Sequence, residues 1–175
     1  MHTRPSFIVM ALAAMPALVT AQGNPVSNTA RDFAKATAAN LLAAAQAMPA
    51  AKYGFKPTAA QWSFAQLVIH IQDDNRITCA AITGAAPAAA ATLAPTDPKE
   101  KLVAALQASL AFCDTALAHV TDAVLGDSVT YYGDRAPRAA AVLGLVADWF
   151  DHYGQQAMYL RLNGVLPPTA KKSGM

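Results

Sequence analysis

The chain has 175 residues, of which 54% are hydrophobic and only 14% are charged. That length suits one ordinary domain, and that composition excludes a disordered polyelectrolyte. The formal net charge of +2 is too small for a nucleic-acid binder, which needs clustered Lys and Arg side chains to contact phosphates. Much of the apolar content is alanine, and alternating β-branched or aromatic runs are scarce, so we predict an all-α protein.

The first segment resembles an export signal. Residues 1–21 contain a basic start with Arg4, an apolar stretch over 7–19 and a small-residue ending at Ala21. The alternative is a membrane anchor, but a span needs about 20 apolar residues and this run is shorter, with Pro16 inside it. We therefore expect cleavage after Ala21, secretion or a periplasmic location, and no later segment long enough to span a membrane.

The remaining sequence predicts one domain over 22–170 followed by a short tail at 171–175. Export also changes the interpretation of the two cysteines, Cys79 and Cys113. In an oxidising compartment we expect them to form a disulfide between two helices, whereas in the cytosol they would be buried thiols.

Apolar periodicity and turn residues predict four helices, at about 28–48, 61–83, 98–120 and 137–162. Ser27 or Asn28 is the expected N-cap of the first helix, and Ser63 with Gln66 forms a capping-box pattern for the second. Asp97 is the expected cap of the third, and 121–136 is expected to be a loop. With no convincing strand, a four-helix bundle is the simplest way to bury the apolar faces.

Three polar side chains interrupt the apolar faces of these helices. His70 lies within an apolar run, where a single histidine is more often a core or boundary residue than a metal ligand. Asp148 and His152 are four residues apart, which places both on one helix face and suits either two arms of a metal site or a simple ion pair. Together they predict a metal site in the bundle, because inward-facing His and carboxylate groups from neighbouring helices can converge there.

Two stretches are similar to the DinB/YfiT-like family. Residues 63–70, SFAQLVIH, resemble the second-helix motif of that family, and residues 151–155 with 159–168 resemble its closing segment. The resemblance implies a four-helix bundle with up-down-down-up topology. It also implies a divalent metal held by one histidine on the second helix and two on the last. His70 and His152 match the first and third of these, whereas Asp148 stands in the place of the second.

The resemblance implies a metal site of His70, Asp148 and His152, with zinc, nickel, manganese and iron as candidate ions. A metal-dependent hydrolase or thiol S-transferase acting on a small molecule is the first functional hypothesis, because relatives include thiol-dependent S-transferases and a maleylpyruvate isomerase. The alternative is a non-catalytic exported bundle that binds metal, serves in stress or carries no metal, as a homodimer through a helix face. Neither hypothesis includes nucleic acid or, after signal cleavage, a membrane.

A few other polar residues are weaker candidates. Asp73 and Asp74 follow His70 closely enough for one of them to accept a hydrogen bond from its ring, although a solvated helix face explains them equally well. His119 fits a solvated helix end. Gln155, Gln156 and Tyr159 follow His152 and either line the same pocket or pack.

Overall fold

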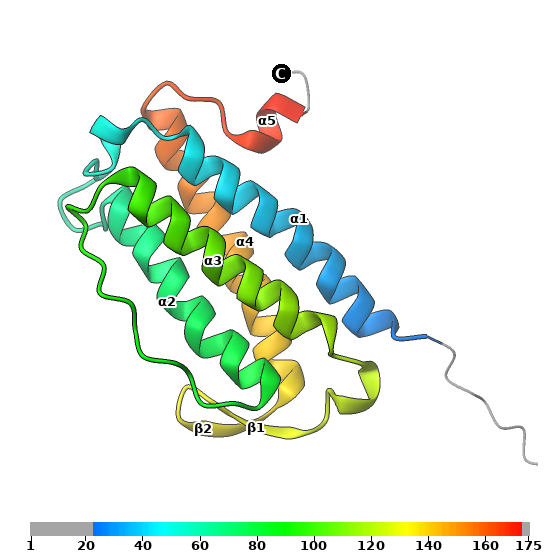
Figure 1. The fold of residues 1–175 in the computed structure, drawn as a ribbon. Helices are drawn as coiled ribbons and strands as arrows, with labels where there is room; N and C mark the ends of the chain where they lie inside the picture. The colour runs from blue at the N-terminus through cyan, green and yellow to red at the C-terminus, as the bar shows by residue number, and fades with distance from the viewer. Residues whose placement is uncertain (1–22, 173–175) are drawn as a thin grey trace, which may run out of the picture.

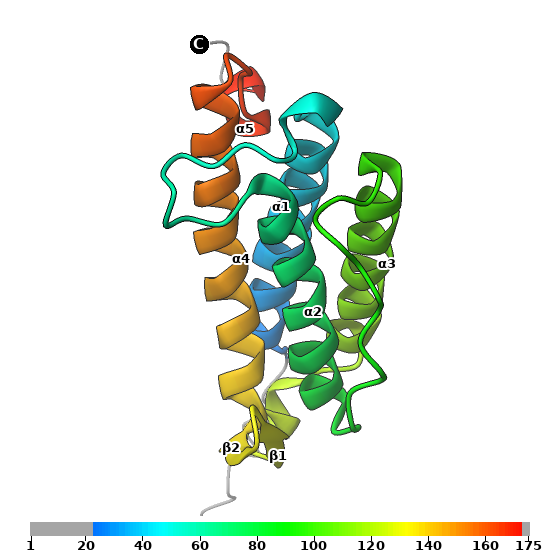
Figure 2. The same ribbon diagram turned by 90° about the vertical axis from the view of Figure 1, so that its left-hand side faces the viewer.

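The computed structural model describes residues 23–172, with side chains up to Ala170. The predicted signal segment 1–21 and residues 173–175 of the predicted tail lie outside this part. Four long helices form a bundle: α1 (Pro25–Ala47), α2 (Phe64–Thr83), α3 (Lys99–Ala118) and α4 (Arg138–Leu162). Figures 1 and 2 show that α2 and α3 run opposite to α1 and α4. The predicted all-α bundle with up-down-down-up topology is therefore confirmed.

Both ends of α2 follow the sequence signals. The Ser63 hydroxyl accepts a hydrogen bond from the Gln66 amide at 3.2 Å, and the Gln66 side chain accepts one from the Ser63 amide at 2.8 Å. Gly84 ends the helix in the left-handed conformation, with φ of 79°, which glycine adopts without steric cost. These two signals fix the length of the helix that carries His70.

The start of α1 differs from the prediction, because the helix begins at Pro25 and neither Ser27 nor Asn28 caps it. Its free amides are satisfied from another part of the chain. The Asp122 carboxylate, in the 3-10 helix η2 (Asp122–Val124), accepts hydrogen bonds from the amides of Val26 at 3.1 Å and Ser27 at 2.8 Å. This long-range cap ties the α3–α4 connection to the start of the bundle.

Helix α3 also departs from two expectations. It begins at Lys99 without a side-chain cap, and Asp97 instead accepts hydrogen bonds from the Ala94 amide and the Lys101 ammonium. By length and composition alone it could cross a membrane, so the expectation that no later segment reaches that length was wrong. Leu102 and Leu106 on this helix are buried in the bundle core.

The predicted loop 121–136 contains a β-hairpin of β1 (Ser128–Tyr131) and β2 (Asp134–Pro137), so the expectation of no strand was wrong. The turn residues Tyr132 and Gly133 both have positive φ, 49° and 91°. Two such residues make the turn whose twist suits a two-residue hairpin. A tyrosine rarely adopts this conformation, so the hairpin holds Tyr132 against its local preference.

The core is apolar, with one fully satisfied polar cluster. The buried Asn75 side chain donates to the Ser109 hydroxyl at 2.9 Å and accepts from the Trp149 indole at 2.6 Å, linking α2, α3 and α4. The predicted disulfide is present: Cys79 on α2 and Cys113 on α3 are bonded, with Cα atoms 5.2 Å apart. Further short helices are η1 (Ala50–Lys52) and α5 (Pro168–Lys172).

Candidate metal centre

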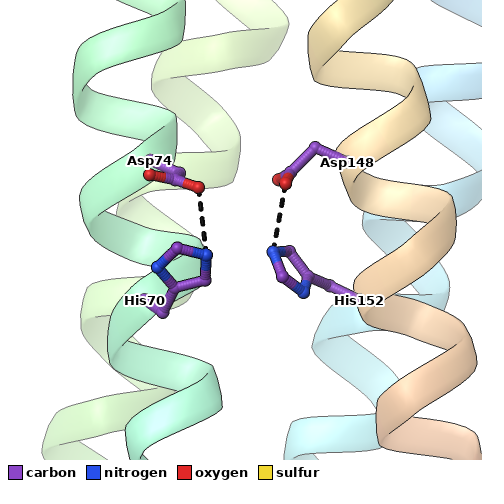
Figure 3. A group of neighbouring side chains, drawn as sticks. All are labelled: His70, Asp74, Asp148 and His152. Carbon is purple, nitrogen blue, oxygen red and sulfur yellow. Dashed lines mark ion pairs between the residues drawn. The ribbon is translucent and has the colours of Figure 1, made fainter. Parts of the chain in front are cut away.

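Two His–Asp pairs face each other across the α2–α4 contact (Figure 3). On α2, His70 Nε2 lies 3.1 Å from Asp74 Oδ2, and on α4, His152 Nε2 lies 3.1 Å from Asp148 Oδ1. The two imidazole rings meet edge to face, with centroids 4.8 Å apart. One potential ligand atom from each of the four residues lies within 4.8 Å of all the others. Helix spacing explains each pair, because residues four apart share a helix face.

The cluster is open on one side and closed on the other. The side chains of His70 and Asp148 are about one-third exposed, at 31% and 33%, whereas that of His152 is 7% exposed. Trp62, in the connection before α2, packs its ring against His70 at 4.5 Å between centroids. The Trp62 carbonyl accepts a hydrogen bond from the Tyr159 hydroxyl at 2.7 Å, which fixes this cover to α4. A ligand from solvent can therefore reach His70 and Asp148, while His152 forms the base.

Burial and neighbouring charges shift the pKa values of the cluster in opposite directions. Burial raises the pKa of Asp74, the His70 imidazole lowers it in part, and the like charge of Asp148 raises it again. Burial lowers the pKa of His152, but the nearby carboxylates, Asp148 above all and then Asp151 and Asp74, together outweigh burial and leave the pKa raised. Two carboxylates held this close favour a cation between them, because a cation offsets their mutual repulsion.

The donor set fits a divalent metal ion. Two ligand atoms bound about 2.1 Å from one ion lie about 3.0 Å apart in octahedral and about 3.4 Å apart in tetrahedral coordination, and the 3.1 Å in each His–Asp pair falls within that range. The structure shows no hydrogen bond from either ring nitrogen of the buried His152 to a described residue, although Nε2 lies 3.1 Å from Asp148 Oδ1. A lone pair on Nε2 that is not used in hydrogen bonding is what a metal ligand requires.

The structure places the three predicted site residues, His70, Asp148 and His152, in one cluster. It adds Asp74, which the sequence indicated only as a hydrogen-bond acceptor for His70. The signal for Asp74 was its spacing of four from a histidine, the same spacing that relates Asp148 and His152. The sequence alone is equally consistent with Asp74 on a solvated helix face, because it does not show how α2 is rotated in the bundle.

The weaker candidates separate into two groups. His119 is exposed at the end of α3, and the Gln155 side chain donates to the exposed Asp151 carboxylate at 2.7 Å. Tyr159 is buried and holds the Trp62 carbonyl. Gln156 is fully buried one turn after His152, and neither its amide nitrogen nor its amide oxygen has a partner among the described side chains and backbone. Sequence reasoning included Gln156 but could not foresee its burial without partners.

Solved structures share this fold at low sequence identity. A DinB-like protein from Bacillus subtilis is 18% identical with a TM-score of 0.64, over 78% of this chain and 92% of that one. A DinB-like protein from Bacillus cereus ATCC 10987 is 13% identical with a TM-score of 0.64, over 78% and 93%. A mycothiol-dependent maleylpyruvate isomerase is 16% identical with a TM-score of 0.60, over 73% of this chain and 59% of its own.

The curated proteins include no significant match to this sequence. The model of the DinB superfamily matches residues 34–155, which carry all four side chains of the cluster. That match covers most of the chain and includes the four bundle helices in whole or in part. The chain belongs to the DinB superfamily.

Proposed function

We propose that this protein binds a divalent metal ion through His70, Asp148 and His152, with Asp74 as a fourth ligand, and uses it in a hydrolase or thiol-transfer reaction. The observation that carries the proposal is the convergence of four potential ligand atoms within 4.8 Å. Two neutral imidazoles and two carboxylates suit zinc, nickel, manganese or iron, so the ligand set alone does not select the ion.

The groups around the cluster support chemistry at its open side. A bound divalent ion lowers the pKa of a water or thiol at a free coordination position. His152 is held at the base, and Asp148 and His70 are accessible, so an incoming molecule meets the accessible pair first. Trp62 covers the His70 ring and limits the directions from which water can approach it.

The thiol branch of the proposal is supported by the fold alone. One of the structural neighbours is a mycothiol-dependent maleylpyruvate isomerase, and a shared bundle at 16% identity does not carry its substrate over to this chain. A hydrolase reaction at a metal-bound water uses the same ligand geometry. We therefore propose metal-dependent catalysis on a small molecule and leave the two reaction types to be separated by assay.

A second function is favoured by one specific observation. Each imidazole already has a carboxylate 3.1 Å away on its own helix, so the cluster also forms two ion pairs without any ion. In that case the protein is a non-catalytic exported bundle, and its polar face serves stability or association with a second copy. Asp148 stands where the family resemblance implies a histidine. If that replacement abolished metal binding, the same two ion pairs would remain.

Export is a separate part of the proposal. The Cys79–Cys113 bond supports an oxidising compartment, because structural disulfides form and persist in the periplasm or outside the cell. We propose that the leader is cleaved after Ala21 and that the mature protein is periplasmic or secreted. Cell fractionation with mass measurement of the mature amino terminus tests this, and an uncleaved cytoplasmic chain would contradict it.

Metal binding is tested on the purified, disulfide-bonded protein. Elemental analysis and calorimetric titration with zinc, nickel, manganese and ferrous ions should give one tight site per chain. His70→Ala and His152→Ala should each weaken it by about a hundredfold or more, because each removes a ligand from a preformed set. His119→Ala is the matched control, since His119 is exposed at the end of α3 and far from the cluster in sequence.

Asp74→Asn separates a four-ligand site from the three-ligand site of His70, Asp148 and His152. If Asp74 coordinates the ion, this variant loses affinity to the same degree as Asp148→Asn. If Asp74 only orients His70, the loss is about tenfold to a hundredfold. Absence of any metal from the wild-type protein, with unchanged stability in both histidine variants, would favour the non-catalytic bundle.

A further inference from the structure

A pocket of about 650 Å³ lies beside the metal centre, between the end of α2, the connection that follows it and the β-hairpin. We name it the hairpin pocket. Its α2 wall includes Ile77 and Ala81. These residues come seven positions after His70 and Asp74, so they lie on the same helix face as the metal pair. The pocket is therefore a continuation of the α2 face that carries the candidate ligands.

Tyr132 forms the boundary between the hairpin pocket and the metal centre. It lines the pocket, and its hydroxyl lies 3.5 Å from the hydroxyl of Thr78, one turn after Asp74. The same hydroxyl interacts with the Asp74 carboxylate. The backbone of Tyr132 is in the left-handed conformation at this point, with φ of 49°.

The lining has an uneven charge. Two arginines, Arg135 and Arg138, line the hairpin pocket, and no acidic residue does. The Arg138 guanidinium is engaged by the carbonyls of Val124 and Ile82 and lies 3.7 Å from Asp127. The Arg135 side chain makes no hydrogen bond or ion pair with any residue that the structure describes, although its backbone pairs with Thr130 across the hairpin. One guanidinium is thus available to an anion.

The other walls are small and of mixed polarity. Ala85, Ala86, Pro87 and Val129 are apolar, whereas Thr83, Ser128 and Thr130 carry hydroxyl groups. A concave site of this mixed kind suits a small organic acid, since the apolar residues contact the carbon body and the free guanidinium holds the carboxylate. A highly charged ligand fits poorly, because a single free guanidinium offsets one negative charge.

We propose that the hairpin pocket is the binding site for a small organic carboxylate, which places its carboxylate on Arg135 and its other end past Tyr132 at the metal centre. The second half of this assignment rests on the proposed function, whereas the first half does not. It names the substrate class as a small monocarboxylate.

The first experiment uses benzoate as the probe and the metal-free, disulfide-bonded protein. Calorimetric titration should show saturable binding, and Arg135→Met should weaken it by about tenfold or more, because methionine keeps an apolar stem and removes the guanidinium. Arg161→Met is the matched control, an exposed arginine near the opposite end of α4, and should change the affinity by less than about twofold. Benzamide, the neutral analogue, should bind about tenfold more weakly than benzoate.

Absence of benzoate binding, or equal binding by wild type and Arg135→Met, would overturn the proposal. The second experiment repeats the titration after loading with Co²⁺. The visible spectrum of the bound ion should change as benzoate saturates the wild type and not in Arg135→Met at the same concentration. An unchanged spectrum with intact benzoate binding would overturn the connection to the metal centre. Failure of Co²⁺ to bind would instead contradict the proposed function and leave the benzoate result standing.

Discussion

Asn75 and Asp74 are neighbours on α2, yet they belong to two different kinds of polar interior. On the α3 side, Asn75 is fully buried and both atoms of its amide are used, with Ser109 and Trp149 as partners. On the α4 side, His152 and Gln156 are buried, and neither makes a side-chain hydrogen bond to a residue that the structure describes. Buried polar groups are normally paired, so the contrast separates a satisfied structural cluster from the candidate metal centre.

Among the structural features, the disulfide should make the largest contribution to the free energy of unfolding. It closes a loop with a sequence separation of 34 residues, which in the chain-entropy model stabilises the fold by about 4 kcal/mol. The double variant Cys79→Ala/Cys113→Ala should lose about this much free energy of unfolding in urea. A reducing agent should reproduce the loss in wild type and have no effect on the variant. A loss below about 1 kcal/mol would show that the unfolded chain gains little freedom on reduction.

Asn75→Ala should destabilise the protein by about 3 kcal/mol, because it leaves the buried Trp149 indole without an acceptor and opens a cavity. Urea unfolding followed by Trp fluorescence measures the loss. Metal affinity per folded molecule should stay unchanged, which separates the two sides of α2. Equal loss of metal binding and stability would show that the two polar regions are not independent.

Saturating metal should stabilise the wild type by about 2.7 kcal/mol when the free ion is at a hundred times its Kd. Thermal unfolding with and without a chelator measures this difference. His152→Ala should abolish the metal effect, because it removes the buried ligand, while His119→Ala should retain it. A chelator-insensitive Tm in wild type would favour the reading of the cluster as two ion pairs.

Gln156→Leu should raise the free energy of unfolding by about 1 kcal/mol. It replaces an amide that is buried without partners by an apolar group of similar size. Asn75→Leu is the contrasting variant, since the same kind of change on the satisfied side should destabilise. A loss of stability in Gln156→Leu would mean that this amide has a partner after all, such as a buried water.

The smallest effect is a pH dependence with opposite signs in the two forms. In the metal-free protein the pKa of His152 is raised above its ordinary value of 6.5. The contribution of His152 to the free energy of unfolding is therefore fully present below pH 6.5 and is lost as pH rises through the pKa of the folded state. Metal binding needs the neutral imidazole, so metal affinity should instead fall as pH decreases. Urea unfolding at several pH values measures the pH dependence of stability, and metal titrations measure the pH dependence of affinity. Asp148→Asn should reduce the pH dependence of stability.

The sequence predicted what depends on local signals. Ser63, Gln66 and Gly84 fix α2 through contacts between near neighbours, so its limits could be derived from residue types alone. The hairpin was missed because its second strand reads Asp-Arg-Ala-Pro, which has neither alternation nor β-branched residues. Packing against α2 and α4, rather than strand propensity, holds it in place.

Long-range features were beyond the sequence for a related reason. The cap of α1 comes from Asp122, 95 positions after Ser27, and no local pattern points to it. The same holds for Asp74, whose place in the cluster depends on how α2 is rotated towards α4. The spacing of four residues gave each His–Asp pair, whereas their approach within 4.8 Å is a property of the assembled bundle.

The antiparallel contact of α2 and α4 has a mechanical consequence. Each helix presents one imidazole and one carboxylate a turn apart, in opposite order along the chain, so in Figure 3 His70 stands opposite His152 and Asp74 opposite Asp148. An ion bound among these four side chains would join α2 to α4. The disulfide already fastens α2 to α3, so the second fastening would immobilise α2 from both flanks.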